Sequence, residues 1–142
     1  MATSWPPSKE VSRALFGMRF KKAVVQACGM EDPEFYLELL TTFFDTVAKK
    51  TLGFGVAARE ALIRGEASIV NPEGKTAPPR DHLRDIAHSI KGTGGNLCLK
   101  EVYSEGLKAQ KGIEGTEDMT VVLALYDGLL RTVEDAKRAL GI

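Results

Sequence analysis

The chain has 142 residues, 44% hydrophobic and 27% charged, which is an ordinary composition for a globular protein of one domain. Lysine plus arginine and aspartate plus glutamate both number 19, and this zero net charge argues against nucleic acid as the main partner. There is no run of 18 apolar residues and no signal-peptide pattern, so we expect a cytoplasmic protein without a membrane partner.

The N-terminal part predicts an irregular lead-in followed by one helix, or by two helical pieces if Gly17 interrupts it. Residues 1–7 contain Trp-Pro-Pro and form the lead-in. Apolar residues then recur at helical spacing over residues 8–28, where Ser8 can cap the helix and Gly29 can end it. We therefore expect helical structure over residues 8–28, as one helix or as two pieces.

A second helical segment begins at Asp32-Pro33-Glu34. This triplet is typical of a helix start, because it offers a cap, a proline in the first turn and an acid near the positive helix end. The apolar stripe that follows predicts a core face: Phe35, Tyr36, Leu39, Leu40, Phe43, Phe44 and Val47. Glycines at 53 and 55 predict a bend, after which the helix continues to about residue 68.

The C-terminal half predicts a loop and three helices. Prolines, asparagine and glycine make residues 69–80 a surface loop by composition. Helical periodicity follows over 81–97 and 101–113, and then in a last helix to near the C-terminus that Thr116 can cap.

No segment alternates with period two, so the predicted fold is all-α. Short connections between the last helices favour antiparallel neighbours. We predict a single domain over residues 1–142, an antiparallel up-and-down four-helix bundle with an additional N-terminal helix.

The helix over 81–97 has one buried and one exposed face. On a helical wheel, His88 lies roughly 150° from the centre of the apolar stripe and therefore faces solvent. Gly92 and Gly95 lie within about 40° of His88, and Lys91 and Arg84 within about 60°. The apolar stripe consists of Leu83, Ile86, Ala87, Ile90, Gly94 and Leu97.

The glycines in this helix need a reason, since each costs about 1 kcal/mol relative to alanine. Gly94 lies on the buried stripe, where a missing side chain allows close packing. Gly92 and Gly95 lie on the exposed face, where it helps only if something must come close. A neutral histidine nitrogen is a competent nucleophile, and Lys91 could pair with a phosphoryl group placed on His88. The alternatives are a solvated histidine and a helix that ends within Gly-Thr-Gly-Gly.

The pattern His-x-x-Lys-Gly-x-x-Gly-x-Leu resembles the signature of histidine phosphotransfer (HPt) domains. The similarity covers roughly residues 20–140 and includes the Asp-Pro-Glu-Phe helix start and the paired phenylalanines that follow it. This chain has Ile90 where the family usually has leucine and Cys98 where it usually has glycine, which puts the end of the helix in doubt. The loop at 69–80 is longer than in compact members.

The resemblance implies a role for each residue of the motif. His88 would accept the phosphoryl group, Lys91 would stabilise it, and Gly92 and Gly95 would leave room for the phosphate and a docking partner. A glutamine of the next helix often contacts the histidine in this family, and Gln110 stands at the matching place. Arg84 would belong to the same docking face.

The implied function is a phosphoryl carrier rather than an enzyme. Its partners would be response-regulator receiver domains and hybrid histidine kinases, and we expect a monomer. The chain has neither a Walker loop nor a glycine-rich kinase loop, so no ATP-dependent activity is expected. No metal site or cofactor of its own is predicted, and Mg²⁺ would come from the receiver. The alternatives are a helical adaptor without phosphate chemistry and a kinase dimerisation module, against which the missing His-Glu-x-x-x-Pro pattern argues.

Overall fold

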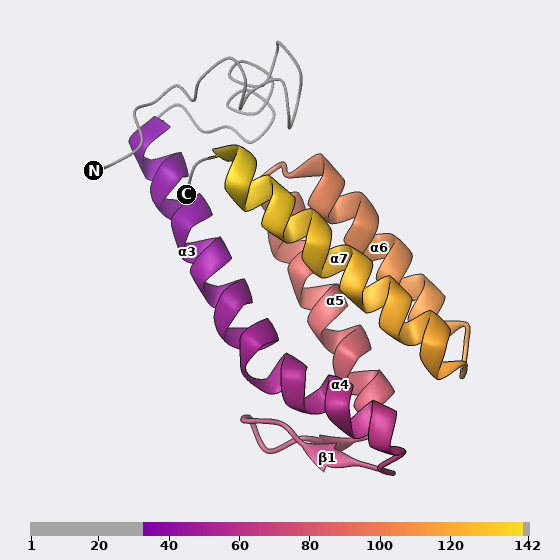
Figure 1. Ribbon diagram of the computed structural model, residues 1–142. Helices are drawn as coiled ribbons and strands as arrows, with labels where there is room; N and C mark the ends of the chain where they lie inside the picture. Colours follow the sequence, from indigo (N-terminus) through magenta and orange to yellow (C-terminus); the bar gives the residue numbers. More distant parts are fainter. Residues whose placement is uncertain (1–32, 141–142) are drawn as a thin grey trace.

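The computed structural model describes residues 33–140, and this part of the chain is mostly helical. The helices lie side by side, and a small two-stranded sheet closes one end, next to α4 (Figure 1). The elements are α3 (Pro33–Leu52), α4 (Phe54–Arg64), β1 (Ile69–Val70), β2 (Thr76–Ala77), α5 (Pro79–Asn96), α6 (Lys100–Glu114) and α7 (Met119–Leu140). The coarse prediction of an all-α fold is confirmed. The lead-in and helix predicted over residues 1–28 lie outside the described residues.

The predicted surface loop at residues 69–80 contains a short hairpin, which the sequence did not indicate. Strands β1 and β2 pair antiparallel, and the backbone N–H of Lys75 donates to Oδ1 of Asn71 across the turn (2.8 Å). His82 of α5 is buried, and its Nε2 lies 2.8 Å from the carbonyl oxygen of Ile69, which ties the hairpin to the helix. Strands of two residues are too short to produce an alternating pattern, so composition alone predicted only a loop.

The last helix begins later than predicted and has a different cap. Its cap is Asp118, whose Oδ1 accepts hydrogen bonds from the backbone N–H groups of Thr120 (2.9 Å) and Val121 (3.4 Å). The hydroxyl of Thr116 instead accepts from the N–H of Asp118 (3.1 Å). The prediction of Thr116 as the cap was therefore wrong, because a carboxylate directly before the helix satisfies its free N–H groups.

The predicted bend between α3 and α4 is confirmed at Gly53. Gly55 lies two residues further on, and a Cβ there would collide with the hydroxyl of Tyr126 on α7. The hydroxyl of Tyr126 is buried and has no hydrogen-bond partner within residues 33–140. A small residue at 55 is thus what allows α4 to pack closely against α7.

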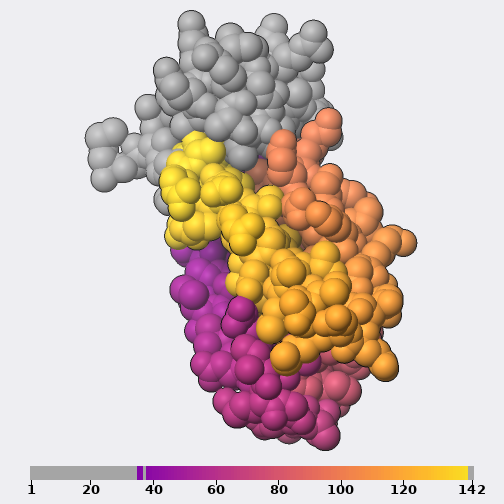
Figure 2. All heavy atoms as spheres, turned by 45° about the vertical axis from the view of Figure 1, so that its right-hand side comes forward, coloured from indigo at the N-terminus to yellow at the C-terminus, as the bar shows by residue number. Residues whose placement is uncertain are grey.

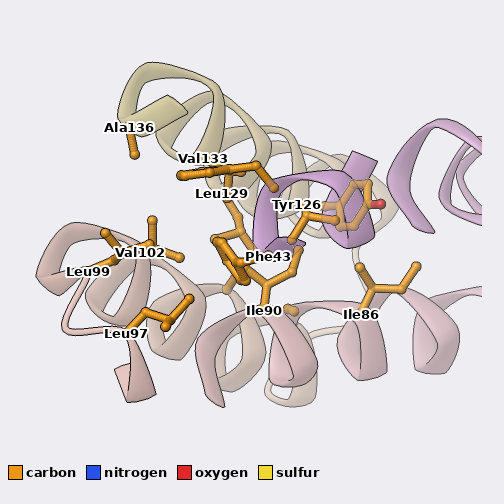
Figure 3. Close-up of a cluster of buried hydrophobic side chains, with 14 of the residues drawn as sticks. Phe43, Ile86, Ile90, Leu97, Leu99, Val102, Tyr126, Leu129, Val133 and Ala136 are labelled. Atoms are coloured by element: carbon orange, nitrogen blue, oxygen red, sulfur yellow. The ribbon is translucent and has the colours of Figure 1, made fainter. Parts of the chain in front are cut away.

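The core fixes the rotation of α5 about its axis. Ile86 and Ile90 of α5 point toward Tyr126 and Leu129 of α7, with Phe43 of α3 between them (Figure 3). Burying each such side chain contributes roughly 1.5–3 kcal/mol, so turning α5 by one residue would cost several times that amount. The side of the helix opposite these residues is therefore held toward solvent.

The aromatic stripe of α3 is buried as predicted, with one exception. Tyr36 and Phe44 are almost fully buried, and the hydroxyl of Tyr36 donates to the carbonyl oxygen of Leu97 at the end of α5 (2.5 Å). Phe35, predicted as core, is 49% exposed.

None of the described helices has the length and apolarity to cross a membrane. In the space-filling view α7 forms the near face, with α6 on one side and α3 and α4 on the other (Figure 2).

Candidate functional site

His88 lies near the middle of α5 and is exposed, as the helical wheel predicts. Its Nδ1 lies 3.0 Å from Oε1 of Gln110 on α6, a hydrogen-bond distance between residues 22 apart in the chain. The pairing that the resemblance implies is therefore present. The other ring nitrogen, Nε2, has no hydrogen-bond partner within residues 33–140. An imidazole held through Nδ1 can present Nε2 to an incoming group.

Close contact between α5 and α6 depends on glycine. A Cβ on Gly106 would lie 2.7 Å from Cβ and 2.9 Å from Cα of Lys91, closer than carbon atoms pack. A Cβ on Gly94 would lie 2.6 Å from Cγ1 of Val102, which confirms the predicted packing reason for that glycine. Gln110 lies one turn beyond Gly106 on α6. The missing side chain of Gly106 is thus what allows Gln110 to reach His88.

The two glycines predicted on the exposed face differ. A Cβ added at Gly92 would have no atom within 4 Å, so packing inside the described part of the chain does not require a glycine there. A Cβ on Gly95 would lie 2.8 Å from Cδ1 of Tyr103 on α6. Gly95 therefore has a packing reason within the chain that the sequence did not indicate, and its role in docking stays a prediction. Of the two, Gly92 is the one that keeps an open surface next to His88.

The two predicted cations, Lys91 and Arg84, differ in whether their charge is paired within residues 33–140. Lys91 is half-buried, and its ammonium group has no ion-pair partner among residues 33–140. Arg84 donates to Oδ1 of Asp85 from Nη2 (2.9 Å) and Nε (3.3 Å), and this hydrogen bonding raises the pKa of Arg84. Burial opposes ionisation of Asp85, but hydrogen bonds from Lys75 and Arg84 hold its pKa below the usual value. Lys91 is therefore the cation available to an anionic ligand, whereas the charge of Arg84 is already paired.

A further cation that the sequence did not indicate lies on the other side of the histidine. Nζ of Lys50, on α3, donates to Oγ of Ser89, the residue after His88 (2.9 Å). Lys50 and Ser89 also line an apolar groove between α3 and α5. The remaining residues of this groove are Leu39, Thr42, Phe43, Thr46, Val47, Ile90, Thr93 and Leu97. No local pattern could have found the contact between Lys50 and Ser89, because the two residues are 39 apart in the chain.

Cys98, at which the resemblance to HPt domains put the end of the helix in doubt, follows the end of the histidine helix. Helix α5 ends at Asn96, and Cys98 has φ of +61°, the left-handed conformation that glycine adopts without strain. The backbone N–H of Leu99 donates to the carbonyl oxygen of Gly94 (2.9 Å), which closes the helix end. The helix is therefore intact through Asn96, and the turn lies directly after it.

Within residues 33–140, no three His, Cys, Asp or Glu side chains are grouped so as to hold a metal ion. Comparisons of the chain with known protein families, with curated proteins and with solved structures give no match. The residues of the site and their geometry are therefore the basis for a function.

Proposed function

We propose that this protein is a histidine phosphotransfer carrier that exchanges a phosphoryl group between His88 and the aspartate of receiver domains. The observation that carries the proposal is the exposed imidazole of His88, bonded through Nδ1 to Gln110 and flanked by the cation of Lys91, which has no ion-pair partner in the described part of the chain. In this proposal the described helices, with the helix predicted over residues 8–28, form the antiparallel up-and-down four-helix bundle of that family with its additional N-terminal helix.

In the proposed reaction, Nε2 of His88 is the nucleophile of phosphoryl transfer. The lone pair of His88 Nε2 attacks the phosphorus of an aspartyl phosphate, a nitrogen–phosphorus bond forms, and the phosphorus–oxygen bond to the aspartate breaks. The aspartate leaves as a carboxylate, and the hydrogen on Nδ1 stays in its bond to Gln110. Lys91 pairs with the phosphoryl oxygens as a point charge. Mg²⁺ bound by the receiver would supply the remaining charge neutralisation.

The docking face is proposed around His88. Gly92 leaves open space beside the ring, and the apolar groove between α3 and α5 lies next to it. Lys50, at the edge of this groove, adds a cation that suits an acidic receiver site. A relay protein has to release its partner after each transfer, so we expect a small, short-lived interface with receiver domains and hybrid histidine kinases. We propose a monomer, because a monomer would keep this face free for a partner. We also propose that the protein is cytoplasmic.

The test is transfer from a phosphorylated receiver, in the presence of Mg²⁺, to the wild-type protein and to His88→Gln. We expect an acid-labile, base-stable phosphate on the wild type only, with unchanged helicity by circular dichroism in the variant, because His88 is exposed. Loss of helicity in His88→Gln would contradict the exposed position of the ring. Equal binding of partners by both proteins without any transfer would favour the adaptor function instead.

A matched pair of lysine variants tests the role of Lys91. Lys91→Gln should slow transfer, whereas Lys108→Gln, at an exposed position of α6, removes the same charge and should leave the rate unchanged. Loss of one charge-assisted hydrogen bond to phosphate corresponds to a slowing of about tenfold. Equal rates in the two variants would refute the role of Lys91.

A further inference from the structure

The side-chain amide of Gln110 lies between two partners, His88 and Glu114. Its Oε1 is 3.0 Å from Nδ1 of His88, and its Nε2 donates to Oε2 of Glu114 one turn further along α6 (3.4 Å). An ionised carboxylate can only accept hydrogen bonds, so the NH₂ group of the amide has to face Glu114. The amide oxygen is thereby turned toward His88.

This orientation decides which nitrogen of His88 carries the proton. A carbonyl oxygen can only accept, so Nδ1 must carry the hydrogen, and Nε2 is left with its lone pair. If Glu114 were absent, the amide could turn over and donate to Nδ1, which would favour the tautomer with the hydrogen on Nε2. That tautomer has no lone pair on the nitrogen that faces solvent and cannot act as the nucleophile there.

The position of Glu114 also lacks a local helical explanation. It is the last residue of α6, where the partial negative charge of the helix end disfavours an acid. Glu114 is exposed, and within residues 33–140 its carboxylate accepts a hydrogen bond from Gln110, while the charge of Arg84 attracts it from α5. The contacts of Glu114 are thus made across to Gln110 and toward α5, on the side of α6 that faces His88.

We propose that Glu114 is a positioning residue that, through Gln110, holds His88 in the tautomer with the hydrogen on Nδ1. The preferred tautomer follows from the hydrogen bonds alone. Its consequence, that Glu114 keeps Nε2 ready for phosphorylation, rests on the proposed phosphotransfer function.

The tautomer can be read directly from the ¹⁵N chemical shifts of the His88 ring at a pH where the ring is neutral. We expect the wild type to carry the hydrogen on Nδ1. In Glu114→Ala the ratio of the two tautomers should shift about fivefold toward Nε2–H, the ratio controlled by one hydrogen bond of ordinary strength. Glu117→Ala removes the same charge from the loop after α6 and should leave the ring shifts unchanged.

A second variant, Gln110→Glu, tests whether Glu114→Ala acts on His88 through the side chain of Gln110. Gln110→Glu places a carboxylate next to His88 that can only accept and cannot be turned over, so it does not need Glu114. The double variant Gln110→Glu/Glu114→Ala should therefore return His88 to the Nδ1–H tautomer. An unchanged tautomer in Glu114→Ala, or no recovery in the double variant, would overturn the proposal.

Phosphorylation by the small donor phosphoramidate separates this proposal from the proposed function. It needs no receiver, and its rate at His88 should fall in Glu114→Ala by the same factor as the Nδ1–H population. If no receiver transfers a phosphoryl group to His88, but Glu114→Ala still shifts the tautomer ratio of His88, the phosphotransfer function is refuted and the role of Glu114 is supported. If receivers transfer at a normal rate, but Glu114→Ala does not shift the tautomer ratio, the phosphotransfer function is supported and the role of Glu114 is refuted.

Discussion

Replacing Gly106 by alanine is expected to separate α6 from α5 and to break the contact between Gln110 and His88. The added Cβ would lie 2.7 Å from Cβ of Lys91, whereas carbon atoms in contact are about 3.5–4.0 Å apart, so the helices must move apart by about 1 Å. The backbone of Lys91 is also within 3.2 Å and cannot rotate away. The distance of 3.0 Å between His88 and Gln110 would then exceed the limit of a hydrogen bond.

The change in stability follows from two opposing effects. Overpacking costs about 1–3 kcal/mol, and replacing glycine by alanine inside a helix gains about 1 kcal/mol. Gly128 of α7 provides the control, because a Cβ there meets no atom within 4 Å and alanine should simply gain about 1 kcal/mol. In urea unfolding, Gly106→Ala should therefore be less stable than Gly128→Ala by about 1–3 kcal/mol.

The same pair of variants tests the effect on the site. Transfer to His88 should slow in Gly106→Ala and stay unchanged in Gly128→Ala, since α7 does not contribute to the contact between His88 and Gln110. Equal unfolding free energies in the two variants, together with unchanged ring shifts of His88, would refute the close approach of α5 and α6 at Gly106.

Three further substitutions test other features. Gly92→Ala should raise the free energy of unfolding by about 1 kcal/mol, because its surroundings are open, and yet slow transfer from a receiver; an unchanged transfer rate would refute its place on the docking face. Cys98→Gly should be more stable than Cys98→Ala by about 1 kcal/mol in thermal unfolding, since both lose the sulfur and only alanine is strained at φ of +61°; equal stability would contradict that conformation. Tyr126→Phe should gain about 1 kcal/mol, because burial leaves the hydroxyl without a partner in the described part of the chain; a loss of stability would reveal a partner.

The phase of the histidine helix could be predicted from the amino-acid pattern. Apolar residues at helical spacing have to face the core, because their burial is the largest favourable term available to the helix. That requirement alone turned His88 toward solvent and Gly94 inward, and both are found there. The same periodicity predicted the buried stripe of α3, and the glycines at 53 and 55 predicted the bend that follows it.

The surroundings of the histidine, in contrast, depend on how the helices pack together. Periodicity gives the face of a helix but not the neighbour that covers it, because the register and rotation between two packed helices depend on side chains of both. The helical wheel therefore assigned Gly92 and Gly95 the same surroundings. In the structure Tyr103 packs next to Gly95, whereas no atom lies within 4 Å of a Cβ added at Gly92. For the same reason the contact of Lys50 with Ser89 joins residues 39 apart, and a short-range pattern has no access to it.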